Sequence, residues 1–169
     1  MLPRRLRNFN VFAAGYSLLG MAEEVTLPKL TRKMEEYRAA GMDAPIKVDM
    51  GQEVMEMEIT SAEISPDLLK TWATSDPAGV ILRFRAALER DAADPATAGL
   101  EVLANGRFSE IDLATAKPGD KHQAKYKLDC VYLKITEAGE EIIEIDAVNM
   151  ILKVGGIDRL AAQRAALGI

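Results

Sequence analysis

The 169-residue sequence contains a single cysteine, Cys130, and a single histidine, His122. One cysteine excludes a disulfide within the chain. A zinc site built from cysteine and histidine is also excluded within one chain, because it needs four such ligands, or three plus water. Any Ser-His-Asp or Cys-His pair would have to use His122, which has no candidate partner nearby. These counts exclude much familiar enzyme chemistry, and we predict that the chain is not an enzyme and has no catalytic, cofactor-binding or metal-binding residues.

Long hydrophobic runs are also lacking. No stretch reaches the roughly 20 apolar residues of a membrane-spanning helix. Hydrophobic residues make up 49% and charged residues 28% of the chain, a composition typical of a globular protein. The length predicts one domain over residues 1–169 with a core of its own.

Basic residues are lacking in two long segments, although the net charge is only −5. Neither Val48–Leu69 nor Ile135–Leu152 contains a lysine or arginine, and both are rich in acids. This balance is the opposite of that expected for a protein that binds nucleic acid in bulk. The pairs Glu56/Glu58 and Glu144/Asp146 are spaced i, i+2, which places each pair on one face of a strand. A solvated face is favoured over a metal or glycosidase site, because no third type of ligand accompanies them.

The first 20 residues combine a basic start with an apolar continuation. Arg4, Arg5 and Arg7 precede the apolar stretch Val11–Ala22, an order that imitates an export signal. The polar residues Asn8 and Asn10 argue against that interpretation. We interpret residues 1–20 as a basic, partly apolar arm that must pack against another protein surface.

Period-two alternation predicts a mainly β protein of about seven strands. The clearest case places Met55, Met57 and Ile59 on one face and acids on the other. Lys29–Pro45 is predicted to be a long loop, and Glu137–Glu140 to close a hairpin. The predicted strands are Met21–Leu27, Ile46–Met50, Val54–Ala62, Val80–Arg90, Leu100–Leu113 (kinked at Asn105-Gly106), His122–Thr136 and Glu141–Val154.

Two helices are predicted. Ser65-Pro66-Asp67 combines a cap, a proline suited to the first helical position and an acid that complements the helix dipole. Trp72 is expected to anchor this helix on the sheet as a core residue. A short C-terminal helix is expected over Arg159–Leu167, closed by Gly168.

Several long stretches resemble the major tail tube protein of contractile-tailed temperate phages and of related phage-tail-like bacteriocins. The similarity runs in order from residue 2 to residue 169. The stretches are LPRRLRNFNVF (Leu2–Phe12), EVTLPKLTRKMEEYR (Glu24–Arg38), GRFSEIDLATAKPGD (Gly106–Asp120), EIDAVNM (Glu144–Met150) and GGIDRLAAQRAALGI (Gly155–Ile169).

The resemblance implies an antiparallel β-barrel or sandwich with one packed helix, related to the tube fold of type VI secretion. It implies homohexameric rings stacked into a hollow inner tube within a contractile sheath, in a virion tail assembled in the bacterial cytoplasm. The implied partners are the sheath, the baseplate or tube initiator, the tube terminator and, during assembly, the tape measure protein in the lumen. DNA would pass without specific binding, or the tube would act as a membrane-piercing rod; the sequence leaves open which particle it belongs to.

Two sets of residues are assigned roles within such a tube. Acids of the two base-free segments are expected to line the lumen and repel passing phosphate, although they could also face outward. The arm and the long loop are expected to reach neighbouring subunits or rings. The alternative function is a monomeric β-barrel that binds a small ligand. The lumen candidates are Glu56, Glu58, Glu144 and Asp146; the contact candidates are Arg4, Arg5, Arg7, Lys29, Arg32, Lys33 and Arg38.

Overall fold

Antiparallel strands dominate the structure, as the alternating pattern predicts. The computed structural model describes residues 2–91 and 96–169, within which there are twelve strands and two short helices. Each strand pair in these ranges is antiparallel. The elements are β1 Arg5–Ala13, β2 Tyr16–Ser17, β3 Ala22–Thr26, β4 Arg32–Tyr37, β5 Ile46–Gln52, β6 Met55–Ser61, α1 Pro66–Leu69, β7 Val80–Glu89, β8 Thr97–Asp112, β9 Ala124–Glu137, β10 Glu140–Asp146, β11 Ile151–Val154, β12 Ile157–Asp158 and α2 Ala161–Leu167.

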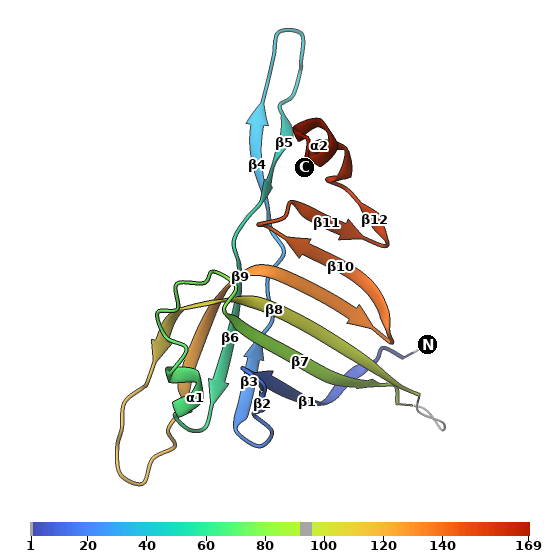
Figure 1. The fold of residues 1–169 in the computed structure, drawn as a ribbon. Helices are drawn as coiled ribbons and strands as arrows, with labels where there is room; N and C mark the ends of the chain where they lie inside the picture. Colours follow the sequence, from blue (N-terminus) through green and yellow to red (C-terminus); the bar gives the residue numbers. More distant parts are fainter. Residues whose placement is uncertain (1, 92–95) are drawn as a thin grey trace.

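The main sheet branches at β9, its central strand. One edge of β9 pairs with β8, while the other edge pairs first with β6 and then with β10. The sheet continues through β6 to β3, through β10 and β11 to β12, and on the β8 side through β7 and β1 to β2. These wings diverge from the middle of the sheet (Figure 1). The hairpin β4–β5 forms a separate two-stranded sheet.

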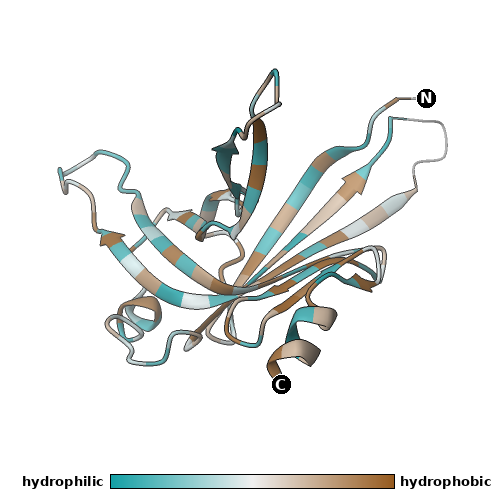
Figure 2. Ribbon diagram, turned by 90° about the horizontal axis from the view of Figure 1, so that it is seen from above, coloured by the Kyte–Doolittle hydropathy of each residue, from teal (hydrophilic) through white to brown (hydrophobic). Residues whose placement is uncertain are grey.

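The core lies on one face of the main sheet. Met55, Met57 and Ile59 on β6 are at most 1% exposed, which confirms the predicted alternation. Their partners Leu128 and Tyr126 on β9 are also fully buried. Burying such apolar side chains is the main favourable term in folding. The alternation of polar and apolar residues is visible along the strands in Figure 2.

The predicted kink at Asn105-Gly106 is present as a β-bulge. The register between β8 and β9 shifts between these two residues. Leu128, before the shift, and Leu133, after it, both face the core. In a regular strand, an even-numbered and an odd-numbered residue would point to opposite faces. Gly106 is required here, because a Cβ at this position would lie 2.0 Å from the carbonyl oxygen of Asp129. The bulge thus keeps one face of β9 polar along its full length.

Helix α1 begins as predicted but ends early. The Ser65 hydroxyl accepts a hydrogen bond from the N–H of Leu68 at 3.5 Å, and the N–H of Ser65 donates to the Tyr126 hydroxyl at 2.9 Å. The prediction for Trp72 is wrong: its side chain is 50% exposed, whereas Leu68 is 1% exposed and seats the helix. The helix ends at Leu69, so Trp72 lies in the following turn and not on the buried stripe.

Three boundaries differ from those predicted. Most of the expected N-terminal arm is a strand of the main sheet, because β1 pairs with β7 along its whole length. The expected loop Lys29–Pro45 contains β4, which pairs with β5. The expected strand Glu141–Val154 is two strands, because Asp146 accepts hydrogen bonds from the N–H groups of Val148 and Asn149 and so stabilises a turn.

Two predicted chain reversals are confirmed. Ala138 and Gly139 both have positive φ (50° and 85°) and join β9 to β10 in a tight hairpin. Gly168 closes α2 with a left-handed φ of 76°. None of the residues of α2 is buried in the chain.

Candidate assembly surfaces

The chain exposes more surface than a monomer of its size. Its accessible area is 10911 Å², whereas a folded monomer of 18.5 kDa is expected to expose about 8,200 Å². The excess, about 2,700 Å², matches the area that one copy buries in several standard protein interfaces. The chain is therefore more extended than a typical folded monomer of its mass.

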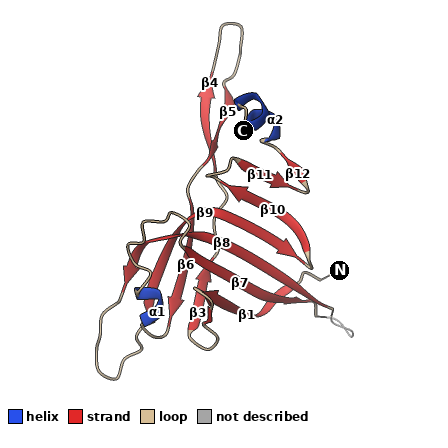
Figure 3. Cartoon of the chain, in the orientation of Figure 1, coloured by secondary structure: helices blue, strands red, loops and turns tan. Residues whose placement is uncertain are grey.

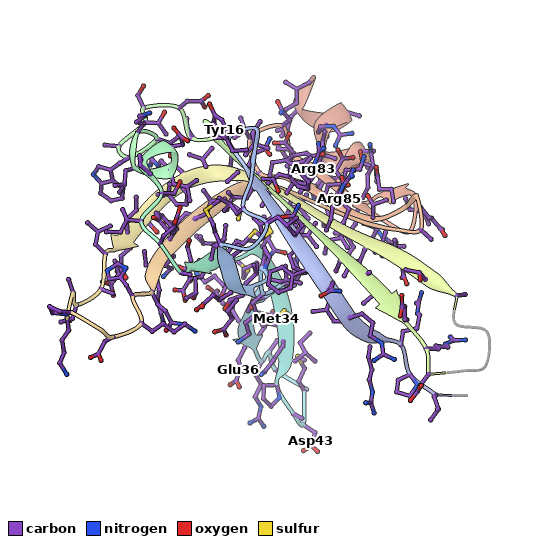
Figure 4. The ribbon with its side chains drawn as sticks, turned by 90° about the horizontal axis from the view of Figure 1, so that it is seen from below. Tyr16, Met34, Glu36, Asp43, Arg83 and Arg85 are labelled. Carbon is purple, nitrogen blue, oxygen red and sulfur yellow. The ribbon has the colours of Figure 1, made fainter. Side chains whose placement is uncertain are left out.

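The hairpin β4–β5 contributes directly to this excess. It projects away from the main sheet (Figure 3), and Figure 4 shows Met34, Glu36 and Asp43 spread along it, far from Arg83 and Arg85 on the main sheet. All six residues of β4 are exposed, as are the first five of β5. A two-stranded hairpin alone is at best marginally stable in water.

The register of the hairpin places most of its apolar side chains on one face. Tyr37 lies opposite Ile46, and Glu35 opposite Val48, so these side chains share one face. The other face carries the pairs Met34–Asp49 and Glu36–Lys47. We call Tyr37, Ile46 and Val48 the hairpin's apolar face, which Glu35 also shares; the three apolar residues are 55%, 52% and 39% exposed in the chain.

The bases expected to make contacts on this segment are partly engaged within it. The Arg32 guanidinium binds Asp49 through two nitrogens, at 2.9 Å and 2.8 Å, and its hydrogen bonds lower the pKa of the Asp49 carboxyl. Arg38 donates to the carbonyl of Met42 at 3.2 Å. Lys33 lies 3.4 Å from Glu35. Arg32 therefore fixes the base of the hairpin, a role that the sequence did not reveal.

The N-terminal bases lie at the edge of the main sheet. Arg4 forms an ion pair with Glu137 and Arg7 lies 3.7 Å from Glu89, whereas Arg5 has no ion pair with a described residue. One edge of β1 pairs with β7, and on the other edge β2 pairs only with its last two residues. Over residues 5–11 that second edge has no strand partner among the described residues.

The four acids expected in the lumen lie on one face of the main sheet, opposite the core. Glu56 and Glu58 alternate with buried residues of β6, and Glu144 and Asp146 alternate with buried Ile145 on β10. The bulge in β8 and β9 keeps both pairs on the same side. The spacing predicted that the two acids of each pair share a face, and the structure places both pairs on a common polar face.

These acids are paired, which the sequence pattern did not predict. Glu56 lies 3.0 Å from Lys127, and Glu58 lies 3.9 Å from Lys125. The hydrogen bond with Glu56 raises the pKa of Lys127. The segments that lack bases therefore lie beside a strand that supplies them. The signal that could have found this is the alternation of Lys125 and Lys127 on β9.

Glu144 is the most enclosed of the four. It accepts hydrogen bonds from Lys153 at 2.8 Å and from the Tyr132 hydroxyl at 2.9 Å, and its side chain is 14% exposed. The bond from Lys153 lowers the pKa of Glu144. Burial, together with this carboxylate, raises the pKa of Tyr132 to about 12. Asp146 instead caps the turn after β10.

A groove of about 760 Å³ lies where the base of the hairpin meets β10, β11 and α2. Its apolar lining includes Val54, Ile145, Met150 and Leu160. We call it the hairpin-base groove. Within residues 2–91 and 96–169 there is no cluster of three side chains placed to hold a metal ion. No helix in those ranges is both long and apolar enough to cross a membrane.

Comparison with known proteins identifies close relatives in sequence. The family described as phage tail tube protein FII matches residues 3–168. The tail tube protein of Escherichia phage P2 is 39% identical over 171 residues, which covers 99% of each chain. The major tail tube protein of Serratia phage KSP20 is 30% identical over 158 residues, covering 92% of this chain and 90% of that protein.

Among solved structures, the sheath/tube terminator of the PVC extracellular contractile injection system has a similar fold. It was determined in the extended state by cryo-electron microscopy. The TM-score is 0.58 with 11% sequence identity, over 80% of this chain and 98% of that one. The likeness therefore lies in the fold.

Proposed function

We infer the function from the family, because the chain belongs to the phage tail tube protein FII family. It is a structural subunit of the tube in a phage virion tail. We propose that six copies form a ring, and that rings stack into a hollow tube inside a contractile sheath. The observation that carries this proposal is the excess of exposed surface, which includes an amphipathic hairpin exposed in the chain.

The open edge of β1 supports assembly into a ring. Unpaired strand edges are templates for pairing with another chain, and closing a sheet around a ring removes them. A head-to-tail contact between unlike surfaces gives a closed ring or a filament. Arg4, Arg5 and Arg7 lie beside this edge and are proposed to contact neighbouring subunits. The same role is proposed for the bases of the hairpin segment, Lys29, Arg32, Lys33 and Arg38.

We propose that the polar face of the main sheet forms the wall of the lumen. Glu56, Glu58, Glu144 and Asp146 would lie on this wall, three of them beside lysines. A wall on which lysines are held by carboxylates offers few free cations to phosphate, so DNA would pass without specific binding. The proposed partners are the sheath, the initiator and terminator of the tube and, during assembly in the bacterial cytoplasm, the tape measure protein.

The test is electron microscopy of the purified chain at increasing concentration, combined with native mass measurement. We expect rings with the mass of six chains, and tubes at higher concentration. Val48→Asp places a charge on the hairpin's apolar face and should block assembly, while the matched control Lys47→Asp on the polar face should assemble. Featureless monomers of the wild-type chain at high concentration would contradict the proposal and favour a monomeric binding protein.

A further inference from the structure

We propose that the hairpin-base groove receives the N-terminal segment Leu2–Leu6 of a second copy. The inference rests on the proposed function and specifies the surfaces through which subunits recognise one another. It assigns a receptor site to a segment that is extended, basic and exposed in the chain itself.

The groove has the shape and floor of a peptide-binding site. Its volume of about 760 Å³ is enclosed by the base of the hairpin, by the turn between β10 and β11, and by α2. Val54 lines the groove and is 72% exposed. An apolar floor of this kind gains free energy when another apolar side chain covers it.

The charges around the groove are predominantly negative. The charged residues of its lining are Asp49, Glu53, Asp129, Asp146, Arg32 and Arg107. Arg32 is bound to Asp49, which leaves three carboxylates facing one guanidinium. Asp129 accepts a hydrogen bond from Ser109 and Asp146 accepts backbone N–H groups. Among the described residues, neither these two acids nor Glu53 has a basic side chain within ion-pair distance.

The N-terminal segment carries the complementary features. Leu2 is 61% and Leu6 is 51% exposed, so more than half of each of these apolar residues is open to solvent in the chain. Arg5 lies between them and makes no ion pair with a described residue. Leu2 and Leu6 would cover the apolar floor of the groove, and Arg5 would bind an acid at its rim. An arginine can bind a carboxylate through two parallel hydrogen bonds.

The segment cannot occupy the groove of its own chain. The ion pair between Arg4 and Glu137 holds it at the turn from β9 to β10, whereas the groove is lined by Asp146 at the opposite end of β10. The N-terminus in Figure 1 lies beside that turn and away from α2. The path from Glu140 to Asp146 along an extended strand is about 20 Å. The contact is therefore between copies and joins unlike surfaces, which is the type that closes rings or extends filaments.

The first experiment is disulfide trapping in the full chain. Leu2→Cys combined with Val54→Cys should give a ladder of covalently linked chains on a non-reducing gel after mild oxidation of assembled protein. Native Cys130 also lines the groove and is replaced by alanine in all of these chains, so that each single variant is a control. Leu2→Cys with Leu113→Cys is the matched pair outside the groove. A ladder from the control pair, or none from the Leu2–Val54 pair, would overturn the inference.

The second experiment is a charge exchange. Arg5→Glu and Glu53→Lys alone should each raise the concentration needed for half-maximal assembly by about tenfold, because each removes an attraction and adds a repulsion. The double variant should return it close to the wild-type value, and Glu63→Lys, an exposed change outside the groove, should have no effect. Without rescue in the double variant, the groove has another occupant. Wild-type assembly distinguishes the failures: tubes without rescue refute only this inference, whereas a chain that never assembles refutes the proposed function as well.

Discussion

Strands β5 and β6 are consecutive in the chain and carry the same alternating pattern, but their environments are opposite. On β6, Met55 and Met57 are at most 1% exposed and lie opposite residues of β9. On β5, Ile46 and Val48 alternate just as regularly but are 52% and 39% exposed. Period-two alternation therefore indicates that one face of a strand is covered, without indicating whether the cover comes from the same chain. We propose that β6 is part of the fold of one copy, while β5 is completed by another.

The largest effect on stability is expected at the β-bulge between β8 and β9. Gly106→Ala should abolish folding or cost more than about 4 kcal/mol, because its Cβ would overlap the carbonyl oxygen of Asp129. Gly99→Ala on the same strand is the matched control, since a Cβ there meets nothing within 4 Å. Urea denaturation followed by circular dichroism gives both values. Equal stability of the two variants would show that the backbone approach at Gly106 is not as close as described.

The direct comparison of the two strands uses one truncation in each. Met57→Ala should reduce the free energy of unfolding of the monomer by about 2–5 kcal/mol, because it leaves a cavity in the core. Val48→Ala should change it by less than about 0.5 kcal/mol, as is usual for an exposed side chain. The same Val48→Ala variant should assemble at higher concentrations than the wild type. A large loss of monomer stability in Val48→Ala would mean that β5 is covered within its own chain.

A smaller effect is expected at Glu144 on the polar face. Lys153 lowers the pKa of Glu144 in the folded chain, so the ion pair stabilises the fold above the ordinary carboxyl pKa of 4.5 and is lost as the pH falls below it. Glu144→Gln should therefore be less stable than the wild type at pH 7, with the difference shrinking toward pH 3. Denaturation at both pH values measures this, and Glu63→Gln is an exposed control. A constant difference at both pH values would exclude the ion pair as its cause.

The smallest effect is expected at the tryptophan near α1. Trp72→Ala should change monomer stability far less than Leu68→Ala, since half of the indole is exposed while Leu68 is enclosed. Thermal unfolding of the two variants below the assembly concentration gives the ranking. A larger loss for Trp72→Ala would restore the role of core anchor expected from the sequence.

The sequence predicted what depends on local chemistry. The start of α1 at Ser65-Pro66, the kink at Asn105-Gly106 and the turn at Ala138-Gly139 each follow from the backbone preferences of the residues involved. The branching of the sheet at β9 did not follow, because it depends on contacts between strands far apart in the chain. The pairing of Glu56 with Lys127 was missed for the same reason, since 71 positions separate them.

The hairpin shows a second limit of such prediction. The mixed charges of Lys29–Pro45 and its length predict a loop, whereas the structure places β4 within it, with all six residues exposed. Gly41 and Pro45 near its end also suggested irregular structure. If another subunit covers β4, the sequence of β4 itself need not alternate. The only sign of a strand is then the apolar alternation of its paired strand β5, at Ile46 and Val48.

Hydrogen exchange of the backbone amides shows whether another copy completes β5, by comparing β5 and β6 in the monomer and in assembled tubes. Amides of β6 should be strongly protected in both states, and those of β5 should exchange rapidly in the monomer and slowly in the tube. Such a change confined to the hairpin would establish that another copy completes it. Equal protection of β5 in the monomer and in the tube would contradict the account.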